Sequence, residues 1–323
     1  MIYFRFPFSE TFYTVAGSDA GIAAVQFVSF NAREQLSFPG ALQEVSEAEV
    51  KAGLSPKKLN RLPPSLTIEN EQEYEDKLNL VIQFIKEHQL PKLVISRRKL
   101  ADFGEKEINL AGTFLNMCAA YPNAFVYIFH HQEDCWAGAF SEVLGKYTKA
   151  TGEFSTMALA ATLPLADSWT KKEIEEQQPV ADFIKTVLEP YDPDVQQSET
   201  TDHISGNIKH LRTDFKATLK PGQLDQVISG LHPTPAVCGI PKDFCQRAIE
   251  SFESHDRKWY SGYIRVETED EVQCFVNLRC AALFDHAALM YAGGGITADS
   301  NPAAEWRETE LKAEAVLKNI VFK

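Results

Sequence analysis

Apolar residues recur in two stretches of the chain at the three- and four-residue spacing that places them on one side of a helix. In residues 71–88 this pattern aligns Leu78, Val81, Ile82 and Ile85 on a single face. The second stretch covers residues 302–320 at the end of the chain. Further helices are predicted over residues 108–120, 171–188 and 207–216. An amphipathic helix needs a partner surface to bury its apolar face, so these segments predict packed layers.

Short runs rich in β-branched and aromatic residues lie between these helices and predict strands. The predicted strands are residues 23–30, 93–96, 124–130, 135–140, 264–266, 272–279 and 288–291. Residues 192–206, rich in Asp, Ser and Thr, are predicted to be a loop. Several strands follow one another without regular β-α-β alternation, so we expect an α+β fold with antiparallel sheets.

The bulk composition is that of a globular protein with a sizeable core, because 44% of the residues are apolar and 24% are charged. A length of 323 residues suits one large domain or two ordinary ones. No internal repeat or low-complexity tract divides the chain, and we expect residues 1–323 to form a single domain. The formal net charge of −13 argues against nucleic acid or an anionic membrane as a partner, since both require clustered Lys and Arg.

Six cysteines are scattered through the sequence without a CxxC pair and without histidines at zinc-finger spacing. Reduced thiols are the expected state, as in the cytosol. The first residues lack the charged-then-apolar order of a signal peptide, and the longest mostly apolar stretch, residues 157–166, is too short to span a bilayer. We therefore expect a cytoplasmic protein.

The C-terminal helix carries a candidate cation site. Asn301-Pro302 is a good helix start, and from there Glu305, Glu308 and Lys312 recur at spacings of three and four along one stripe. Two carboxylates beside a buried apolar stripe can hold a hard cation, because Mg²⁺ takes one or two carboxylates and keeps several waters. By spacing alone, a solvated Glu/Lys face remains the more common reading of this pattern.

Two further segments have unusual composition. Residues 293–295 are three glycines next to a predicted strand, which allows a ligand close to the backbone N–H groups. A P-loop is excluded because no GK[ST] follows, and a plain turn is the commoner meaning of such a run. Residues 231–242 contain three prolines that hold an extended course. His232 in that segment is better explained by a structural hydrogen bond than by catalysis.

Taken together, these segments resemble the chorismate-utilising enzymes, a family of isochorismate, salicylate, anthranilate and aminodeoxychorismate synthases. The resemblance runs from about Lys92 to the C-terminus. Its strongest pieces are HPTPAVCGIPK (232–242), HDRKWYSG (255–262), NLRCA (277–281) and YAGGGITADSNPAAEWRETELKA (291–313). The resemblance implies two large antiparallel sheets packed together with helices outside, a shortened strand region at residues 1–70 and a catalytic core at residues 90–323.

The resemblance also implies a Mg²⁺ ion on the ring carboxylate of the substrate. Glu308 and Glu176 would hold the metal, and Glu305 would support its shell. Lys312 would face the same carboxylate. The remaining pocket residues implied by the family are Arg279, Tyr260 and the backbone at Gly293 for the enolpyruvyl carboxylate, His210 facing the ring, and Thr162, Ala236 and Val237 as lining.

The branches of the family differ in nucleophile, and two residues here match the branch that uses water. Lys92, in PKLVISR, would activate the water, and Glu142, in GAFSE, would protonate the leaving hydroxyl. The expected reaction is therefore that of an isochorismate synthase, in which water adds at C2 of chorismate and the C4 hydroxyl is lost. A salicylate synthase, which also eliminates pyruvate, and a non-catalytic chorismate-binding protein remain the alternatives.

The sequence also departs from the family pattern. Ala161 stands where a glycine is usual, Ser141 where a proline precedes the acid, and Glu175 where His or Arg is frequent. The expected partner is chorismate alone, without nucleic acid or membrane, and the protein is expected to act as a monomer. Isochorismate feeds menaquinone or catechol siderophores, and we favour menaquinone biosynthesis.

Overall fold

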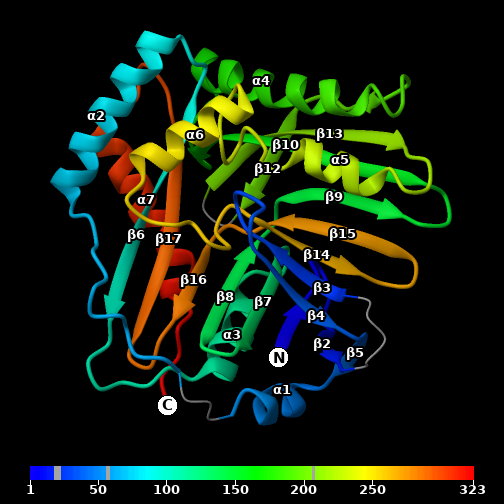
Figure 1. The fold of residues 1–323 in the computed structure, drawn as a ribbon, viewed down its shortest axis with the longest axis vertical. Coiled ribbons are helices and arrows are strands. Elements are labelled where there is room, and N and C mark those ends of the chain that lie inside the picture. Colours follow the sequence, from blue (N-terminus) through cyan, green and yellow to red (C-terminus); the bar gives the residue numbers. More distant parts are fainter. Residues whose placement is uncertain (18–22, 56–58, 206–207) are drawn as a thin grey trace.

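The computed structural model describes residues 1–17, 23–55, 59–205 and 208–323, except for the side chains of Thr162, Lys172, Glu175, Glu176, Ser205 and Ile208. Two large antiparallel β-sheets pack against each other, and helices cover their outer surfaces (Figure 1). The α+β architecture expected from the order of strands and helices is therefore confirmed.

In the described part of the chain, eight strands make up the first sheet, with antiparallel pairing throughout. In sheet order they are β5 (Ala41–Val45), β2 (Phe12–Ala16), β1 (Ile2–Arg5), β7 (Phe125–His131), β8 (Asp134–Phe140), β16 (Cys280–Leu283), β17 (Ala287–Ile296) and β6 (Leu93–Asp102). Along β7, Phe125, Tyr127 and Phe129 point to one face, and Val126 and Ile128 point to the other. Both faces of this sheet are therefore buried.

The second sheet has nine strands among the described residues, again paired antiparallel. Its main path is β11 (Gln196–Gln197), β13 (Ile208–Thr218), β10 (Glu153–Pro164), β9 (Val143–Thr148), β15 (Glu271–Val276), β14 (Tyr263–Glu267), β3 (Ala23–Val28) and β4 (Gln35–Pro39). The ninth strand, β12 (Thr201–Ser205), pairs with β13.

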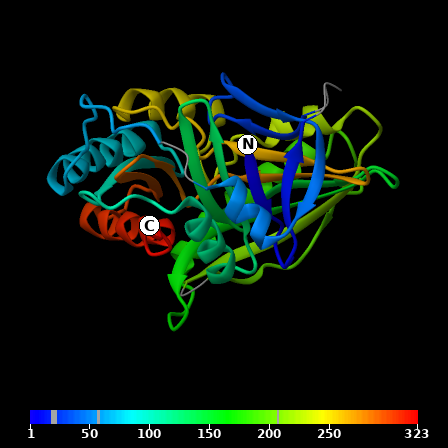
Figure 2. The same ribbon diagram turned by 90° about the horizontal axis from the view of Figure 1, so that it is seen from below.

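An aromatic layer joins the two sheets. Phe27 of the second sheet lies 4.8 Å from Phe129 and 5.1 Å from Tyr127 of the first, measured between ring centroids. Phe275 stacks on Phe125 at 4.4 Å. Such pairs contribute about 0.5–1.5 kcal/mol each beyond the burial of their area. These side chains hold the two sheets against each other. The ribbon of the two sheets is seen from below in Figure 2.

Seven helices in the described chain cover the outside of the sandwich. They are α1 (Glu47–Gly53), α2 (Glu71–His88), α3 (Leu110–Ala120), α4 (Lys171–Leu188), α5 (Leu224–Leu231), α6 (Lys242–Phe252) and α7 (Pro302–Leu317). The apolar faces of α1, α3 and α7 pack on the outer face of the first sheet. Those of α4 and α5 pack on the second sheet, and α2 and α6 pack beside β6. Over the described residues, every helix is too short or too polar to cross a membrane.

Local sequence signals account for the helix ends that were predicted correctly. Helix α2 covers residues 71–88 as expected, and its start is a capping box. The Asn70 side chain accepts a hydrogen bond from the N–H of Glu73, and the Glu73 carboxylate accepts one from the N–H of Asn70. Helix α7 begins at Pro302, where the Asn301 side chain accepts from the N–H of Ala304.

Four predictions of secondary structure were wrong. Residues 207–216 were expected to be helical, but 208–218 form strand β13, in which Leu211, Thr213, Phe215 and Ala217 are buried at every second position. A period of two marks a strand, and pairing with β10 along most of its length favours it over a helix. The loop expected at 192–206 contains the short strands β11 and β12.

The third and fourth differences concern the glycine run and Arg279. The three glycines lie within β17, where Gly293 pairs with Ser96 and Gly295 with Val94, and do not follow the strand. Arg279 lies between β15 and β16, outside the strand predicted over residues 272–279. Its φ of 45° breaks the extended backbone at that point.

Candidate active site

Lys92 and Glu142 come from different strand ends and act on each other electrostatically. Lys92 directly precedes β6 and is 4% exposed. Glu142 lies in the two-residue link between β8 and β9 and is 7% exposed. Burial raises the pKa of Glu142 to about 7, although the positive charges of Lys92 and Arg279 oppose that rise. The carboxyl group therefore carries a proton over a large part of the neutral range.

Arg279 connects this acid to the C-terminal helix. Its left-handed backbone conformation is uncommon for a residue with a long side chain. Burial lowers the pKa of Arg279, and the nearby Tyr260, Glu308 and Glu142 act in the opposite direction. The guanidinium remains charged because an arginine does not lose its proton in proteins. Arg279 is therefore a cation that acts electrostatically on both Glu142 and Glu308.

Helix α7 projects its polar stripe towards the glycines of β17. The ammonium of Lys312 lies 2.5 Å from Glu308 Oε1 and donates a 2.8 Å hydrogen bond to the carbonyl of Gly293. Burial acts to raise the pKa of Glu308, but the positive charges of Lys312 and Arg279 outweigh it and the pKa is lowered. Glu305 Oε1 accepts a 2.8 Å hydrogen bond from Ser300 Oγ. Glu308 is therefore an ionised carboxylate among cations.

The glycines allow β17 to approach its neighbours closely. A Cβ atom at Gly293 would lie 2.8 Å from the carbonyl oxygen of Ile95 and 3.0 Å from the Tyr260 hydroxyl. At Gly294 it would lie 2.9 Å from Glu305 Oε2. Side chains at these positions would displace groups of the site, which explains the glycines better than a turn does.

His210, on β13, presents a neutral ring to the site. Its Nδ1 lies 2.9 Å from the carbonyl oxygen of Ala161, and since a carbonyl can only accept, Nδ1 carries the hydrogen. Burial lowers the pKa of His210 to about 4. The carbonyl is turned towards the ring by a bulge in β10 between Ala160 and Leu163, where Ala161 has a φ of 57°. His210 therefore acts as a neutral ring at pH 7.

For the remaining described residues of the predicted pocket, and for His232, the structure shows burial, packing and structural hydrogen bonds. Tyr260 is buried, and its ring stacks on Tyr291. Ala236 and Val237 lie within the proline-rich segment, and Val237 packs into the core beneath the second sheet. His232 Nε2 lies 3.2 Å from the carbonyl oxygen of Ser29 and 3.1 Å from that of Phe30, as expected for a structural histidine.

The predicted metal ligand Glu176 lies on α4, but its side chain is outside the described part of the structure, as is that of Thr162 on β10. Among the side chains that are described, no group of three or more His, Cys, Asp or Glu residues could hold a metal ion. The six cysteines are free and buried.

One buried ionic cluster next to the site was not anticipated from the sequence. Glu253 and Arg257 form an ion pair whose two side chains are each 2% exposed. The Ser96 hydroxyl donates a hydrogen bond to Glu253, and His255 hydrogen-bonds with that hydroxyl. The i,i+4 spacing of Glu253 and Arg257 was visible in the sequence. This spacing did not predict a buried ion pair, because the same spacing is common on solvated helix surfaces.

Comparison with known proteins identifies the family of this chain. Residues 29–321 match the family described as chorismate binding enzyme. The chain is 28% identical over 263 residues to the salicylate biosynthesis isochorismate synthase of Pseudomonas aeruginosa, which covers 76% of this chain and 54% of that protein. The chain spans about half the length of the curated relatives it matches.

Two solved structures share the fold. The 2,3-dihydroxybenzoate-specific isochorismate synthase DhbC of Bacillus anthracis superposes with a TM-score of 0.80 at 20% identity, covering 98% of this chain and 95% of that one. The menaquinone-specific isochorismate synthase MenF of Escherichia coli superposes with a TM-score of 0.79 at 18% identity, covering 98% and 88%. With the family match over most of the sequence, these observations show that the chain belongs to the chorismate binding enzymes.

Proposed function

We propose that this protein is an isochorismate synthase, which isomerises chorismate by adding water at C2 and releasing the C4 hydroxyl. The observation that carries the proposal is the buried pair of Lys92 and Glu142, with the pKa of Glu142 raised to about 7. A general acid works best when its pKa lies near the working pH. The names of the relatives support the same activity.

In this reaction Lys92 takes a proton from the attacking water, and Glu142 gives its proton to the departing oxygen. The lysine must be uncharged when it acts, and the carboxyl group must be protonated. The burial of Glu142 provides the second condition. The two groups act on opposite faces of the ring, because one serves C2 and the other the oxygen at C4.

The substrate carries two carboxylates, and the site has cations for both. Arg279, with Tyr260 and the backbone at Gly293, holds the carboxylate of the enolpyruvyl arm. A guanidinium can bind such a group through two parallel hydrogen bonds. Lys312 faces the ring carboxylate, and neutral His210 lies against the ring without adding charge. Thr162, Ala236 and Val237 line the pocket.

The donor set of α7 fits a magnesium ion. Glu308 is ionised and Glu305 presents carboxylate oxygens beside Gly294, which are the hard ligands Mg²⁺ prefers. Glu176 would complete the set from α4. When bound, the ion would anchor the ring carboxylate and draw electron density towards it. The ammonium of Lys312 partly neutralises Glu308.

Incubating the protein with chorismate and Mg²⁺ and separating the products tests the proposal. Isochorismate alone is the expected product. Salicylate together with pyruvate would identify a salicylate synthase, and chorismate that binds without being converted would identify a non-catalytic binding protein. Turnover at full rate after EDTA treatment would refute the metal assignment.

Two variants test the acid–base pair, with an exposed lysine as control. Lys92→Ala should stop isochorismate formation while chorismate still binds, because this lysine acts on water and not on a substrate carboxylate. Glu142→Gln keeps the shape but cannot donate a proton, so kcat should fall at least about 10²-fold. Lys86→Ala, on the exposed side of α2, should leave kcat and chorismate binding unchanged. Normal isochorismate production by Lys92→Ala would remove the main reason for assigning the protein to the branch of the family that uses water.

The biological setting is part of the proposal. We infer that residues 1–323 form one chorismate-binding domain that acts as a monomer in the cytoplasm, and that its isochorismate serves menaquinone biosynthesis. Loss of menaquinone after deletion of the gene, with restoration by supplied isochorismate, would support this setting. Loss of a catechol siderophore instead would place the protein in the other pathway.

A further inference from the structure

The buried ion pair of Glu253 and Arg257 lies next to β6, the strand that begins directly after Lys92. The carboxylate of Glu253 accepts hydrogen bonds from Nε of Arg257 at 2.9 Å and from its terminal nitrogen at 2.6 Å. It also accepts from the backbone N–H of Ser96 at 2.7 Å and from the Ser96 hydroxyl at 2.9 Å. The same Arg257 donates to the carbonyls of Val94 and Val237, each at 2.8 Å.

The pair therefore connects three segments that are distant in the sequence. Through Val94 and Ser96 it holds β6, and through Val237 it holds the middle of the proline-rich segment. The two held segments also bond each other, because the N–H of Val94 donates to the carbonyl of Cys238 at 2.9 Å. Glu253 and Arg257 come from the stretch that follows α6. We name Glu253, Arg257 and Ser96 the β6 clamp.

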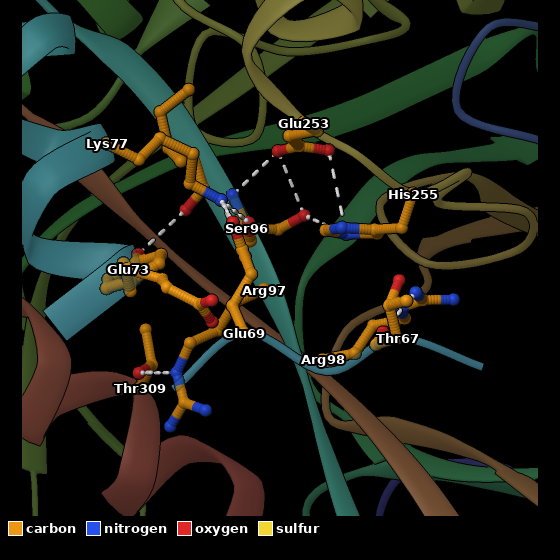
Figure 3. Close-up of polar contacts among 12 residues, drawn as sticks. Thr67, Glu69, Glu73, Lys77, Ser96, Arg97, Arg98, Glu253, His255 and Thr309 are labelled. Carbon is orange, nitrogen blue, oxygen red and sulfur yellow. Dashed lines mark hydrogen bonds and ion pairs between the residues drawn. The ribbon is translucent and has the colours of Figure 1, made fainter. Parts of the chain in front are cut away.

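His255 completes the cluster without making it a hydrolytic triad. The Ser96 hydroxyl lies 3.1 Å from His255 Nε2 and lies between that ring and Glu253 (Figure 3). A hydroxyl has one hydrogen, and here the carboxylate accepts it, so the serine oxygen accepts from His255 Nε2. A serine that donates to a carboxylate is not activated as a nucleophile, since activation requires donation to the histidine. Ser96 is also fully buried.

The clamp holds two groups of the candidate site at once. Lys92 lies four residues before Ser96 along the strand, and β6 is extended over this distance. On the other side of Ser96, its backbone partner is Gly293, and a Cβ atom at Gly293 would lie 3.1 Å from Ser96 Cα. A shift of β6 would therefore move both the lysine and the glycine backbone.

Stability alone does not explain a cluster of this kind. Apolar residues of similar volume are often as stabilising as a buried ion pair, because both charges must lose their water. The pair does hold backbone groups of β6 and of the proline-rich segment in place. Its donors and acceptors are all satisfied only when these groups lie in their observed positions. A small displacement of a catalytic group can cost about 10²-fold in rate.

We propose that Glu253, acting through Ser96, and Arg257, acting through the carbonyl of Val94, are positioning residues that hold the start of β6 so that Lys92 reaches the attacking water. This inference rests on the proposed function of Lys92. The clamp itself contacts neither substrate nor metal. Its effect should therefore appear in kcat and in the local motion of β6, with little change in chorismate binding.

Hydrogen exchange measured by mass spectrometry on the full chain tests the clamp apart from any activity. Glu253→Gln should make peptides covering residues 93–97 and 236–240 exchange about 10-fold faster, because the amide cannot accept all the donors that face it. Glu310→Gln is the matched control. Glu310 pairs with Arg97 and Lys99 on the opposite side of β6, so its loss should leave residues 236–240 protected.

Kinetics of the same variants then tests the role of the clamp. Glu253→Gln should lower kcat about 10-fold or more while KM for chorismate changes less than about threefold. Glu253→Asp, which keeps the charge, should recover part of the loss. If Glu253→Gln does not fold, Ser96→Ala removes only the hydroxyl and should still lower kcat several-fold at constant KM.

The outcomes separate this inference from the proposed function. Faster exchange in β6 with unchanged kcat, or an unchanged kcat in Ser96→Ala, would overturn the positioning role. A wild-type protein that converts no chorismate would overturn the proposed function, and the positioning role with it. The exchange data would in that case still report whether the clamp holds β6.

Discussion

At the scale of single residues, two groups are held in states that the free amino acids do not favour. Burial raises the pKa of Glu142 to about 7, and Ala161 has a backbone conformation that suits glycine. Both residues lie at the proposed site. Unfavourable states of this kind cost stability and are found mostly where they serve binding or catalysis. Each can be tested by measuring stability, without reference to the reaction.

Replacing Glu142 by Gln should stabilise the protein above pH 7 and not at pH 4. The pKa is raised in the folded state, so folding takes up a proton between the ordinary pKa near 4.5 and the folded value of about 7. Stability is therefore lost as the pH rises through this window, and the loss amounts to about 3 kcal/mol. Urea unfolding at pH 4 and pH 8 measures the difference, and equal effects at both would contradict the burial.

The same titration should appear in the rate. If Glu142 is the acid, forward turnover should fall as the pH rises through about 7, because the proton needed by the leaving oxygen is lost. The profile of kcat/KM between pH 6 and pH 9 measures this limb in the free enzyme. A limb that persists unchanged in Glu142→Gln would belong to another group.

Ala161→Gly should be neutral or slightly stabilising. A left-handed conformation costs an L-residue about 1–2 kcal/mol, and the greater freedom of glycine in the unfolded chain offsets about 0.4–1 kcal/mol of that. Ala158→Gly in the same strand is the control, because Ala158 is buried in an ordinary strand position and should lose about 1 kcal/mol or more. Equal losses at both positions, measured by urea unfolding, would refute the strain at Ala161.

At the scale of elements, strand β17 and helix α7 form the site by close approach. The strand can come near because its glycines have no side chains, and the helix projects Glu305, Glu308 and Lys312 along one stripe towards it. Neighbouring glycines of the strand face different groups. Gly293 meets backbone atoms and Tyr260, whereas Gly294 meets the movable end of Glu305.

Gly293→Ala should therefore destabilise the fold more than Gly294→Ala. The new Cβ of the first would press on the carbonyl of Ile95, which is fixed by strand pairing, and we expect a loss of roughly 1–3 kcal/mol. The second should mainly displace Glu305 and weaken Mg²⁺ binding. Thermal unfolding and titration calorimetry with MgCl₂ measure the two effects, and a reversed order of stabilities would contradict the packing of β17.

At the scale of the whole molecule, buried histidines make the fold sensitive to acid. Burial lowers the pKa values of His210, His232 and His255 to about 4. The unfolded chain takes up these three protons near pH 6.5 and the folded chain does not, so stability falls as the pH drops below that value. Glu142 acts in the opposite sense with one proton.

The unfolded chain thus binds about two more protons than the folded chain. The free energy of unfolding should therefore fall by roughly 2–3 kcal/mol per pH unit between pH 6 and pH 5. Urea unfolding across this range measures the slope. The Glu142→Gln variant should be steeper, because it removes the one opposing proton. A slope near zero in the wild type would show that the histidines are accessible to protons in the folded state.

The sequence by itself determined most of what is local in this protein. Capping residues and apolar periodicity predicted α2 and α7, and the motifs around Lys92, Arg279 and residues 291–313 indicated the family. These features depend on residues within a few positions of one another. The helix predicted at 207–216 failed because residues 208–218 are stabilised by pairing with β10, a partner some fifty residues away.

Only the tertiary structure decided how the groups act. It brought Glu142 and Arg279 together, bent β10 at Ala161 so that a carbonyl faces His210, and placed Glu253 and Arg257 behind β6. Each of these depends on burial or on contacts between distant segments. A pKa and a hydrogen-bond partner are set by the surrounding atoms, and no local pattern in the sequence records which atoms those are.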